Sequence, residues 1–245
     1  MANNFCKLDS LLKEQAVHDS GRTFPDVYGY ARSMSEVENV VAVVSDLSLG
    51  TSKIFNGAFA EVLGISDYSE ENSIWEKKIL SLMSAHEREE KFIAELRFFH
   101  YLRRLGPKRR HYYLMSKLRL SAGGEKSIDV LHRMYYIYDD ASGSVRFAIC
   151  LYGPLSVDFK GKSAAVNSLT GVSEELTSSG DSCILSHRER QILALIDSGM
   201  KSREIAEYLC ISTHTVSRHR QEILAKLKVK NSIEACRLAR SMRMI

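Results

Sequence analysis

At 245 residues, the chain has room for about two domains of ordinary size. Its 44% hydrophobic and 26% charged residues are typical of a folded globular protein and exclude fibrous and disordered classes. No apolar run approaches the ~18 residues of a membrane-spanning helix, and residues 1–20 lack the apolar core of a signal peptide, so we expect a cytoplasmic protein without membrane contact.

The cysteines argue against structural cross-links. The five are at positions 6, 150, 183, 210 and 236, an odd number with no C-x-x-C pair, which disfavours both a disulfide framework and a zinc site. The sequence also contains no Gly-rich phosphate loop and no evident nucleophile–base pair. We expect reduced thiols, no metal site, no catalytic residues and no enzymatic activity.

The first part of the chain begins with a helix and two strands. Residues 1–24 predict a helical extension, with an amphipathic helix over residues 1–15. The β-branched run Val40–Val44 predicts a buried strand, and residues 53–55 predict a second one.

Helical patterns follow these strands. Asn56 is expected as the N-cap of a short helix over residues 57–63, which Gly64 closes. A second helix is predicted over residues 72–83. A longer helix covers residues 85–105, with one apolar face that we expect to be buried: Phe92, Ile93, Leu96, Phe99 and Leu102.

Three strand-like segments, residues 111–120, 128–138 and 145–151, complete this part. Their apolar residues alternate, and Gly- or Asp-containing turns separate them, as in an antiparallel meander. The order of two strands, helices and three strands, together with the phrase Asn56–Gly64 (NGAFAEVLG), resembles a PAS sensor domain over residues 25–157. The resemblance implies an α+β fold, an antiparallel sheet with helices, that senses a signal or mediates dimerisation.

The resemblance to PAS domains raises the question of a bound group. His86 and His100 are the candidate axial ligands of a haem, but a surface or core role is the simpler interpretation of each. The Asn-Cys-Arg-type phrase of photoactive flavin domains is absent. We therefore expect no haem or flavin, and either an unidentified small apolar ligand or none. The aromatic-rich strands would line a pocket, a dimer interface or an ordinary core.

A composition change separates this region from the C-terminus. Residues 158–181 are rich in Ser, Gly and small residues and predict a linker, although Ala164–Leu169 could form a short strand. Residues 182–245, which we expect to be a separate domain, carry 12 Lys+Arg against 6 Asp+Glu, whereas the rest of the chain carries 22 against 24. Positive charge therefore gathers in the C-terminal domain, as binding to phosphates would require.

The C-terminal domain predicts four helices. Ser186 and Glu189 have the S-x-x-E spacing of a capping box at the start of the first helix. Ser202 and Ser212 are expected as N-caps of the second and third helices, and residues 232–242 form the fourth.

The third helix has two contrasting faces. Its buried stripe should contain Val216, Ile223 and Leu227, with His219 or Arg220 completing it. The opposite face is polar and rich in hydrogen-bond donors: His214, Ser217, Arg218, Gln221 and Ala225. Two short helices joined by a tight turn, with a polar outer face on the second, fit the major groove of B-DNA.

This C-terminal segment closely resembles the LuxR/FixJ/NarL type of helix-turn-helix over about residues 185–240. The matching residues include Leu185-Ser186-x-Arg188-Glu189-x-x-Ile192-Leu193, Glu204-Ile205-Ala206-x-x-Leu209-x-Ile211-Ser212, Thr215-Val216-x-x-His219, Ile223 and Lys226-Leu227. Arg203 stands where the family often has Lys or Asn, and Asn231-Ser232 replaces a frequent Arg. The resemblance implies an all-α four-helix DNA-binding domain.

The resemblance also implies site residues. Those placed to read bases are His214, Ser217, Arg218 and Gln221, of which Arg218 suits guanine and Gln221 suits adenine. Those placed to hold the DNA backbone are Lys201, Ser202, Thr213, Thr215, His219 and Lys226.

The sequence thus predicts a sequence-specific transcription regulator that binds double-stranded DNA. Symmetric operators imply a homodimer, and the family resemblance implies RNA polymerase as a further partner. The alternative is a signalling adaptor that acts through protein–protein contacts without a ligand.

Overall fold

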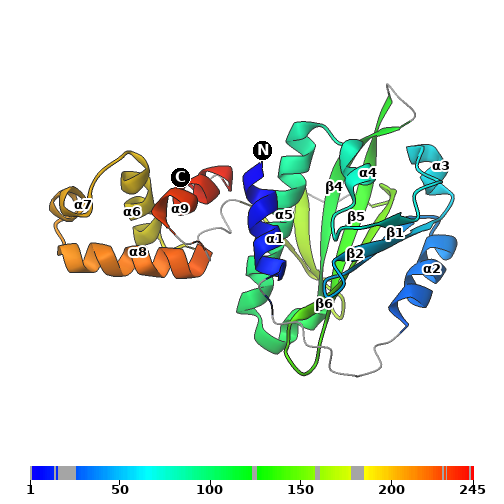
Figure 1. Ribbon diagram of the computed structural model, residues 1–245, viewed down its shortest axis with the longest axis horizontal. Helices are drawn as coiled ribbons and strands as arrows, with labels where there is room; N and C mark the ends of the chain where they lie inside the picture. The colour runs from blue at the N-terminus through cyan, green and yellow to red at the C-terminus, as the bar shows by residue number, and fades with distance from the viewer. Residues whose placement is uncertain are drawn as a thin grey trace. The chain divides into compact units, whose positions relative to one another are not determined.

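The computed structural model describes residues 2–13, 15, 26–122, 126–157, 161–177, 185–227, 229, 231–242 and 244–245 (Figure 1). The chain divides into two compact units, one of residues Leu8–Leu176 and one of Met1–Lys7 with Thr177–Ile245. Among the described residues, no helix is long and apolar enough to cross a membrane.

The first unit is built on an antiparallel sheet with the strand order β3-β2-β1-β6-β5-β4-β7-β8. The strands are β1 Val41–Asp46, β2 Thr51–Asn56, β3 Glu70–Glu71, β4 Tyr112–Ala122, β5 Lys126–Tyr138, β6 Val145–Pro154, β7 Ser163–Asn167 and β8 Ser173–Glu175. The β2-β1-β6-β5-β4 core, with its helices between β2 and β4, confirms the PAS-like α+β fold that the sequence predicted.

Helices cover both faces of this sheet (Figure 1). They are α1 Ala2–Lys13, α2 Val27–Val37, α3 Phe59–Leu63, α4 Lys77–Ser81 and α5 Ala85–Arg104, followed by the 3-10 helix Gly106–His111. α2 packs on the face that carries Ile149, whereas α5 lies on the face that carries Cys150. Because successive side chains of a strand point to opposite faces, α2 and α5 lie in separate layers on the two sides of the sheet. We call the α5 side the inner face.

Local sequence signals explain most of these boundaries. Ser84 caps α5 by accepting a hydrogen bond from Glu87 N at 3.1 Å, and the predicted apolar face of α5 is buried. Gly64 ends α3 with a φ of +68°, as a C-terminal glycine should. Gly57 allows a close backbone approach, because a Cβ there would lie 2.1 Å from Ser35 O.

Two helix predictions need correction. Asn56 does not cap α3: it ends β2, and its side chain donates to Ser66 O and Tyr68 O. The helix expected over residues 72–83 is reduced to α4. Residues 72–75 form bends instead, in which the carbonyls of Ile74 and Ser73 accept hydrogen bonds from the hydroxyls of Ser45 and Ser52, at 3.2 and 2.8 Å.

The helix predicted over residues 1–15 is confirmed as α1, and the short strand considered at Ala164–Leu169 is present as β7, but most of the described part of the predicted linker belongs to the sheet domain. Within residues 158–181, β7 and β8 extend the sheet, because small and β-branched side chains let Ala164–Val166 pair with the edge of β4. α1 buries Leu8 and Leu12 against the first unit, whereas residues 14 and 16–25 lie outside the described part of the chain. The remaining linker positions 158–160 and 178–181 and the loop 123–125 lie outside the described residues.

The C-terminal unit contains the four predicted helices: α6 His187–Asp197, α7 Ser202–Tyr208, α8 Thr213–Leu227 and α9 Ser232–Ser241. The capping box is confirmed, since Ser186 N donates to Glu189 Oε2 at 2.7 Å and Glu189 N donates to Ser186 Oγ at 3.3 Å. Ser212 caps α8 through Thr215 N at 3.0 Å. Ser202 is the first residue of α7 rather than its N-cap, which is Lys201.

Candidate functional site

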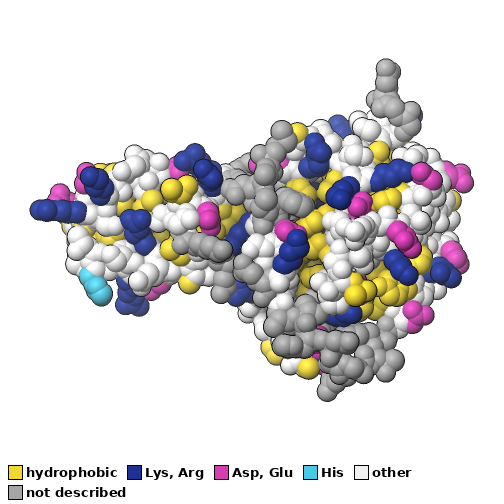
Figure 2. Space-filling view, viewed as in Figure 1, with side chains coloured by type: hydrophobic (Ala, Val, Ile, Leu, Met, Phe, Trp, Pro, Cys, Tyr) yellow, Lys and Arg dark blue, Asp and Glu magenta, His cyan; other side chains and the backbone are white. Residues whose placement is uncertain are grey.

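The outer face of α8 carries the four predicted base-reading residues. His214, Ser217, Arg218 and Gln221 are all exposed, whereas Val216, Ile223 and Leu227 on the same helix are buried. The helix therefore presents one polar face while the other packs against its domain, as the sequence predicted. Figure 2 shows Lys and Arg side chains distributed over this C-terminal part.

Arg218 remains available to a ligand despite an ion pair. Its Nε donates to Glu222 Oε1 at 3.0 Å, one helical turn away. Because its side chain is 74% exposed, this pair stabilises the helix by only ~0.3–0.5 kcal/mol. The terminal nitrogens of the guanidinium have no partner among the described residues, so the bidentate edge that suits guanine is free.

Three of the predicted backbone-contact residues have partners inside the domain. Ser202 Oγ accepts from Arg220 Nη1 at 2.8 Å, and the Thr215 hydroxyl lies 2.8 Å from Ser212 Oγ. Lys226 Nζ donates to both oxygens of Glu189 at 2.7 Å. To bind DNA, these side chains would have to share or exchange these hydrogen bonds. Lys226, Lys201 and Thr213 are exposed, whereas Ser202 and Thr215 are half-buried.

Arg220 is a structural residue that connects three helices. From α8 it reaches Ser202 on α7, and its Nη2 donates to Ser232 Oγ on α9 at 2.9 Å. The sequence placed Arg220 or His219 in the buried stripe, and both are half-buried. Arg220 thus fixes the orientation of the recognition helix α8 within its domain.

A second ion pair anchors the C-terminal end of α8. Burial raises the pKa of Glu189, but hydrogen bonds from Lys226 and from the backbone at Ser186 outweigh it and lower the pKa below its ordinary value. Glu189, His219 and Glu222 present ligand atoms within 4.8 Å of one another, the only such group found in the described part of the chain. Since Lys226 already occupies both oxygens of Glu189, the geometry is that of an ion-pair network rather than a metal site.

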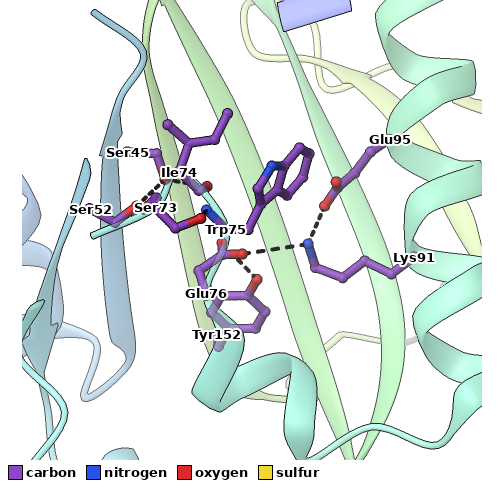
Figure 3. A network of polar contacts seen from close by, with 9 residues as sticks. All are labelled: Ser45, Ser52, Ser73, Ile74, Trp75, Glu76, Lys91, Glu95 and Tyr152. Carbon is purple, nitrogen blue, oxygen red and sulfur yellow. Dashed lines mark hydrogen bonds and ion pairs between the residues drawn. The ribbon is translucent and has the colours of Figure 1, made fainter. Parts of the chain in front are cut away.

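The inner face of the PAS-like domain holds a buried charged cluster that the sequence analysis missed (Figure 3). Lys91 and Glu95, one turn apart on α5, form an ion pair at 2.5 Å. Glu76 lies 3.9 Å from Lys91 and accepts a hydrogen bond from the Tyr152 hydroxyl at 3.2 Å. We call Glu76, Lys91, Glu95 and Tyr152 the core charge cluster; each is at most 2% exposed.

Burial and neighbouring charges shift the pKa values of three members of this cluster, Lys91, Glu95 and Tyr152. Burial alone would lower the pKa of Lys91, but Glu95 and Glu76 outweigh it and raise the pKa, so the lysine is an ammonium ion. Burial raises the pKa of Glu95, and Lys91 only partly counteracts this. Burial also raises the pKa of Tyr152 well above its ordinary value, so its phenol stays protonated and donates.

A neutral histidine lies beside the cluster. His132 is fully buried, its ring stacks on Tyr152 at 4.8 Å, and burial together with Lys91 lowers its pKa well below the ordinary value. Neither ring nitrogen has a hydrogen-bond partner in the described structure, nor does Ser116 Oγ, the cross-strand neighbour of His132. Buried polar groups without hydrogen-bond partners are uncommon in folded proteins, so His132 and Ser116 are unusual features of this domain.

A cavity of about 20 Å³ borders the core charge cluster, large enough for one water-sized group. Glu76, Lys91 and Glu95 form its polar wall. Its other lining residues are Leu8, Leu12, Ser45, Leu47, Ile74, Trp75, Met134, Tyr136, Ala148 and Cys150.

The sequence-based candidates for this domain are placed elsewhere. His86 is exposed and His100 is buried beside Phe99, and neither lines the cavity. The aromatic strands divide between the two faces: Tyr136 reaches the cavity, whereas Tyr135 stacks on Tyr113 at 4.8 Å on the opposite face. A signal for the charge cluster was present, since Lys91 and Glu95 flank apolar residues of the buried α5 face.

Comparison with known proteins supports the assignment of the C-terminal part. Residues 183–239 match the model of the family described as bacterial regulatory proteins, luxR family. The Oxygen regulatory protein NreC of Staphylococcus epidermidis is 40% identical over 85 residues, which cover 34% of this chain and 39% of that protein. The uncharacterized response regulatory protein YgeK of Escherichia coli is 43% identical over 58 residues, covering 24% of this chain and 40% of that protein.

These matches span about two fifths of the length of the curated relatives. Among solved structures, the Vibrio cholerae VqmA–ligand–DNA complex is 15% identical with a TM-score of 0.35, covering 89% of each chain, a similarity too low to support an inference about this protein. The family match coincides with the four helices and the capping box described above. The C-terminal part of this chain is therefore a LuxR-type helix-turn-helix domain, which follows a PAS-like domain.

Proposed function

We propose that the protein is a sequence-specific, DNA-binding transcription regulator whose PAS-like domain senses a small-molecule signal. The observation that carries the proposal is the exposed polar face of α8, opposite a fully buried apolar stripe. A helix that only packed against protein partners would present apolar anchors on its outer face. This one presents hydrogen-bond donors and acceptors of the kind that read base edges.

The roles follow from side-chain chemistry. Arg218 would donate two hydrogen bonds to guanine, and Gln221 would both donate to and accept from adenine, with His214 and Ser217 beside them. Lys201 and Thr213 would hold phosphates and set the register without reading sequence. Ser202, Thr215, His219 and Lys226 would support these contacts from the same surface.

The proposed assembly is a homodimer acting in the cytoplasm. Helix-turn-helix proteins read symmetric half-sites with paired recognition helices, so a selected operator should be palindromic. RNA polymerase is the further partner that the family resemblance suggests.

Selection from a random double-stranded DNA pool with the full-length protein tests the proposal. A palindromic motif is expected. Arg218→Ala should weaken binding to that motif by about 1–3 kcal/mol per contacted base and relax the preference at one position of each half-site.

Arg203→Ala is the matched control. Arg203 forms the same exposed pair with a glutamate one turn away, at 3.2 Å from Glu207. Its loss should leave the base preference unchanged. Selection that yields no motif would contradict the proposal and favour a signalling adaptor that acts through protein contacts.

A further inference from the structure

The cavity beside the core charge cluster combines apolar walls with spare acceptor capacity. Leu8 and Leu12 of α1 cover it on one side, and Met134 and Ala148 of the sheet line another. Glu95 accepts a hydrogen bond from Lys91 and has no second donor among the described residues. A carboxylate offers about four lone-pair sites, so Glu95 can accept further donors from a ligand.

Charge selects the kind of group that the cavity would accept. The polar wall of the cavity contains two carboxyl groups, those of Glu76 and Glu95, against the single ammonium group of Lys91. An anion would be repelled, and Lys91 is already paired. A cationic donor would favour the ionised form of Glu95, which burial opposes, and would supply its carboxylate with further hydrogen-bond donors.

The volume of the cavity and its cover by α1 limit the size of that ligand. A volume of about 20 Å³ accommodates a group the size of water or of an ammonium head. A short apolar tail would lie against Leu8 and Leu12. The tail needs more room than the cavity provides, and a modest shift of α1 would supply it. Trp75 Nε1, which donates to Asp9 Oδ1 at 2.8 Å, connects α1 to the wall of the cavity.

We propose that this cavity binds a small aliphatic amine in its ammonium form, with the charged head at Glu95 and the tail beneath α1. The proposal rests on the sensing function proposed above and gives the signal a chemical class. It also differs from the small apolar ligand that the sequence suggested, because the structure places the charged side chains of Glu76, Lys91 and Glu95 on the wall of the cavity.

Trp75 provides a direct readout, since it is the single tryptophan of the chain and lines the cavity. Titration of the full-length protein with propylammonium chloride at constant ionic strength should change Trp75 fluorescence saturably, with a Kd of about 0.1–10 mM for so small a probe. Propan-1-ol and sodium propionate, of similar size, should give no saturable change. An equal response to propan-1-ol would overturn the proposal.

Two variants locate the site. Glu95→Gln should weaken propylammonium binding at least tenfold, whereas Glu89→Gln, an exposed position on the same helix, should change it less than twofold. Ala148→Val fills the cavity without altering any charge, and should abolish binding even if Glu95→Gln fails to fold. Unchanged binding by Ala148→Val would overturn the proposal.

The propylammonium titration and the operator selection can fail independently of each other. Selection of an operator does not require the amine, so a protein that selects an operator but ignores propylammonium remains a regulator with another signal. A protein that binds propylammonium at Glu95 but selects no operator would retain this site and lose the proposed regulatory function.

Discussion

Two ion pairs with the same helical spacing lie in opposite environments. Lys91–Glu95 on α5 and Arg218–Glu222 on α8 each join residues four apart, at 2.5 and 3.0 Å. The side chains of the first pair are at most 3% exposed, whereas those of the second are 74% and 38% exposed. A contact that looks the same in sequence therefore has different energetic meaning in the two domains.

The difference lies in desolvation. A buried charge must recover its lost hydration from its partner, so removing one member leaves an uncompensated charge. An exposed charge returns to water at little cost. Lys226–Glu189 is an intermediate case, with side chains 45% and 1% exposed. The three pairs form a graded series that stability measurements can test.

The largest effect is expected for Lys91→Met. It leaves Glu95 and Glu76 buried without their ammonium and should lower the free energy of unfolding of the PAS-like domain by about 3–5 kcal/mol. Urea unfolding followed by Trp75 fluorescence measures it. Arg218→Met is the control and should change stability by less than about 0.5 kcal/mol. The double variant Lys91→Met/Glu95→Leu should recover most of the loss; equal losses in the single and double variants would contradict the pairing.

Lys226→Gln should have an intermediate effect. Glu189 loses its charged partner but keeps the hydrogen bond from Ser186 N, so a loss of about 1–2 kcal/mol is expected. Far-UV circular dichroism during urea unfolding reports the helical domain. A loss as large as that of Lys91→Met would mean that exposure of one partner does not moderate the cost.

The variant His132→Leu tests, through the pH dependence of stability, whether the buried histidine is neutral in the folded protein. The folded-state pKa of His132 lies below that of the unfolded chain, so the unfolded state takes up more protons as pH falls below about 6.5. Stability of the wild-type domain should therefore fall by up to ~1.4 kcal/mol per pH unit between about pH 6.5 and 5 from this group. His132→Leu should flatten this dependence, and exposed His86→Leu should not. An unaltered slope in His132→Leu would contradict a neutral His132.

Glu222→Gln should have the smallest effect. Loss of an exposed pair lowers stability by only ~0.2–0.5 kcal/mol. Removal of an acid beside Arg218 should leave binding to the selected operator equal or slightly tighter, as electrophoretic mobility-shift titrations would measure. A stability loss above 1 kcal/mol would contradict a solvent-exposed Arg218–Glu222 pair.

How well the sequence predicts structure also differs between the two domains. In the helix-turn-helix domain the information is local: capping by Ser186 and Ser212 and the spacing of Val216, Ile223 and Leu227 specify each helix within a few residues. The exposed face of α8 was therefore foreseen. Whether its residues contact DNA as assigned remains a prediction.

In the PAS-like domain the errors arise where distant segments meet. The strand β7 pairs with β4, about fifty residues earlier in the chain, so residues 158–181 alone suggested a linker with at most a short strand at Ala164–Leu169 and not the pairing that incorporates it into the sheet. The core charge cluster joins Glu76, α5 and β6. The apolar neighbours of Lys91 and Glu95 on α5 indicated burial, but the contacts with Glu76 and Tyr152 cannot be predicted from α5 alone. Asn is a residue type that is common at N-caps, but the side-chain amide of Asn56 donates to the carbonyls of Ser66 and Tyr68 instead of capping a helix.

The connection that Arg220 makes among α7, α8 and α9 has a consequence for how operator preference can change over evolution. The side chains that orient the recognition helix point into the domain, and those assigned to bases point away from it. We therefore expect substitutions at Arg218 or Gln221 to change the proposed base preference while leaving the stability of the domain unchanged. Gene duplicates of such a regulator could acquire new targets by drifting at these positions while the scaffold stays under constraint.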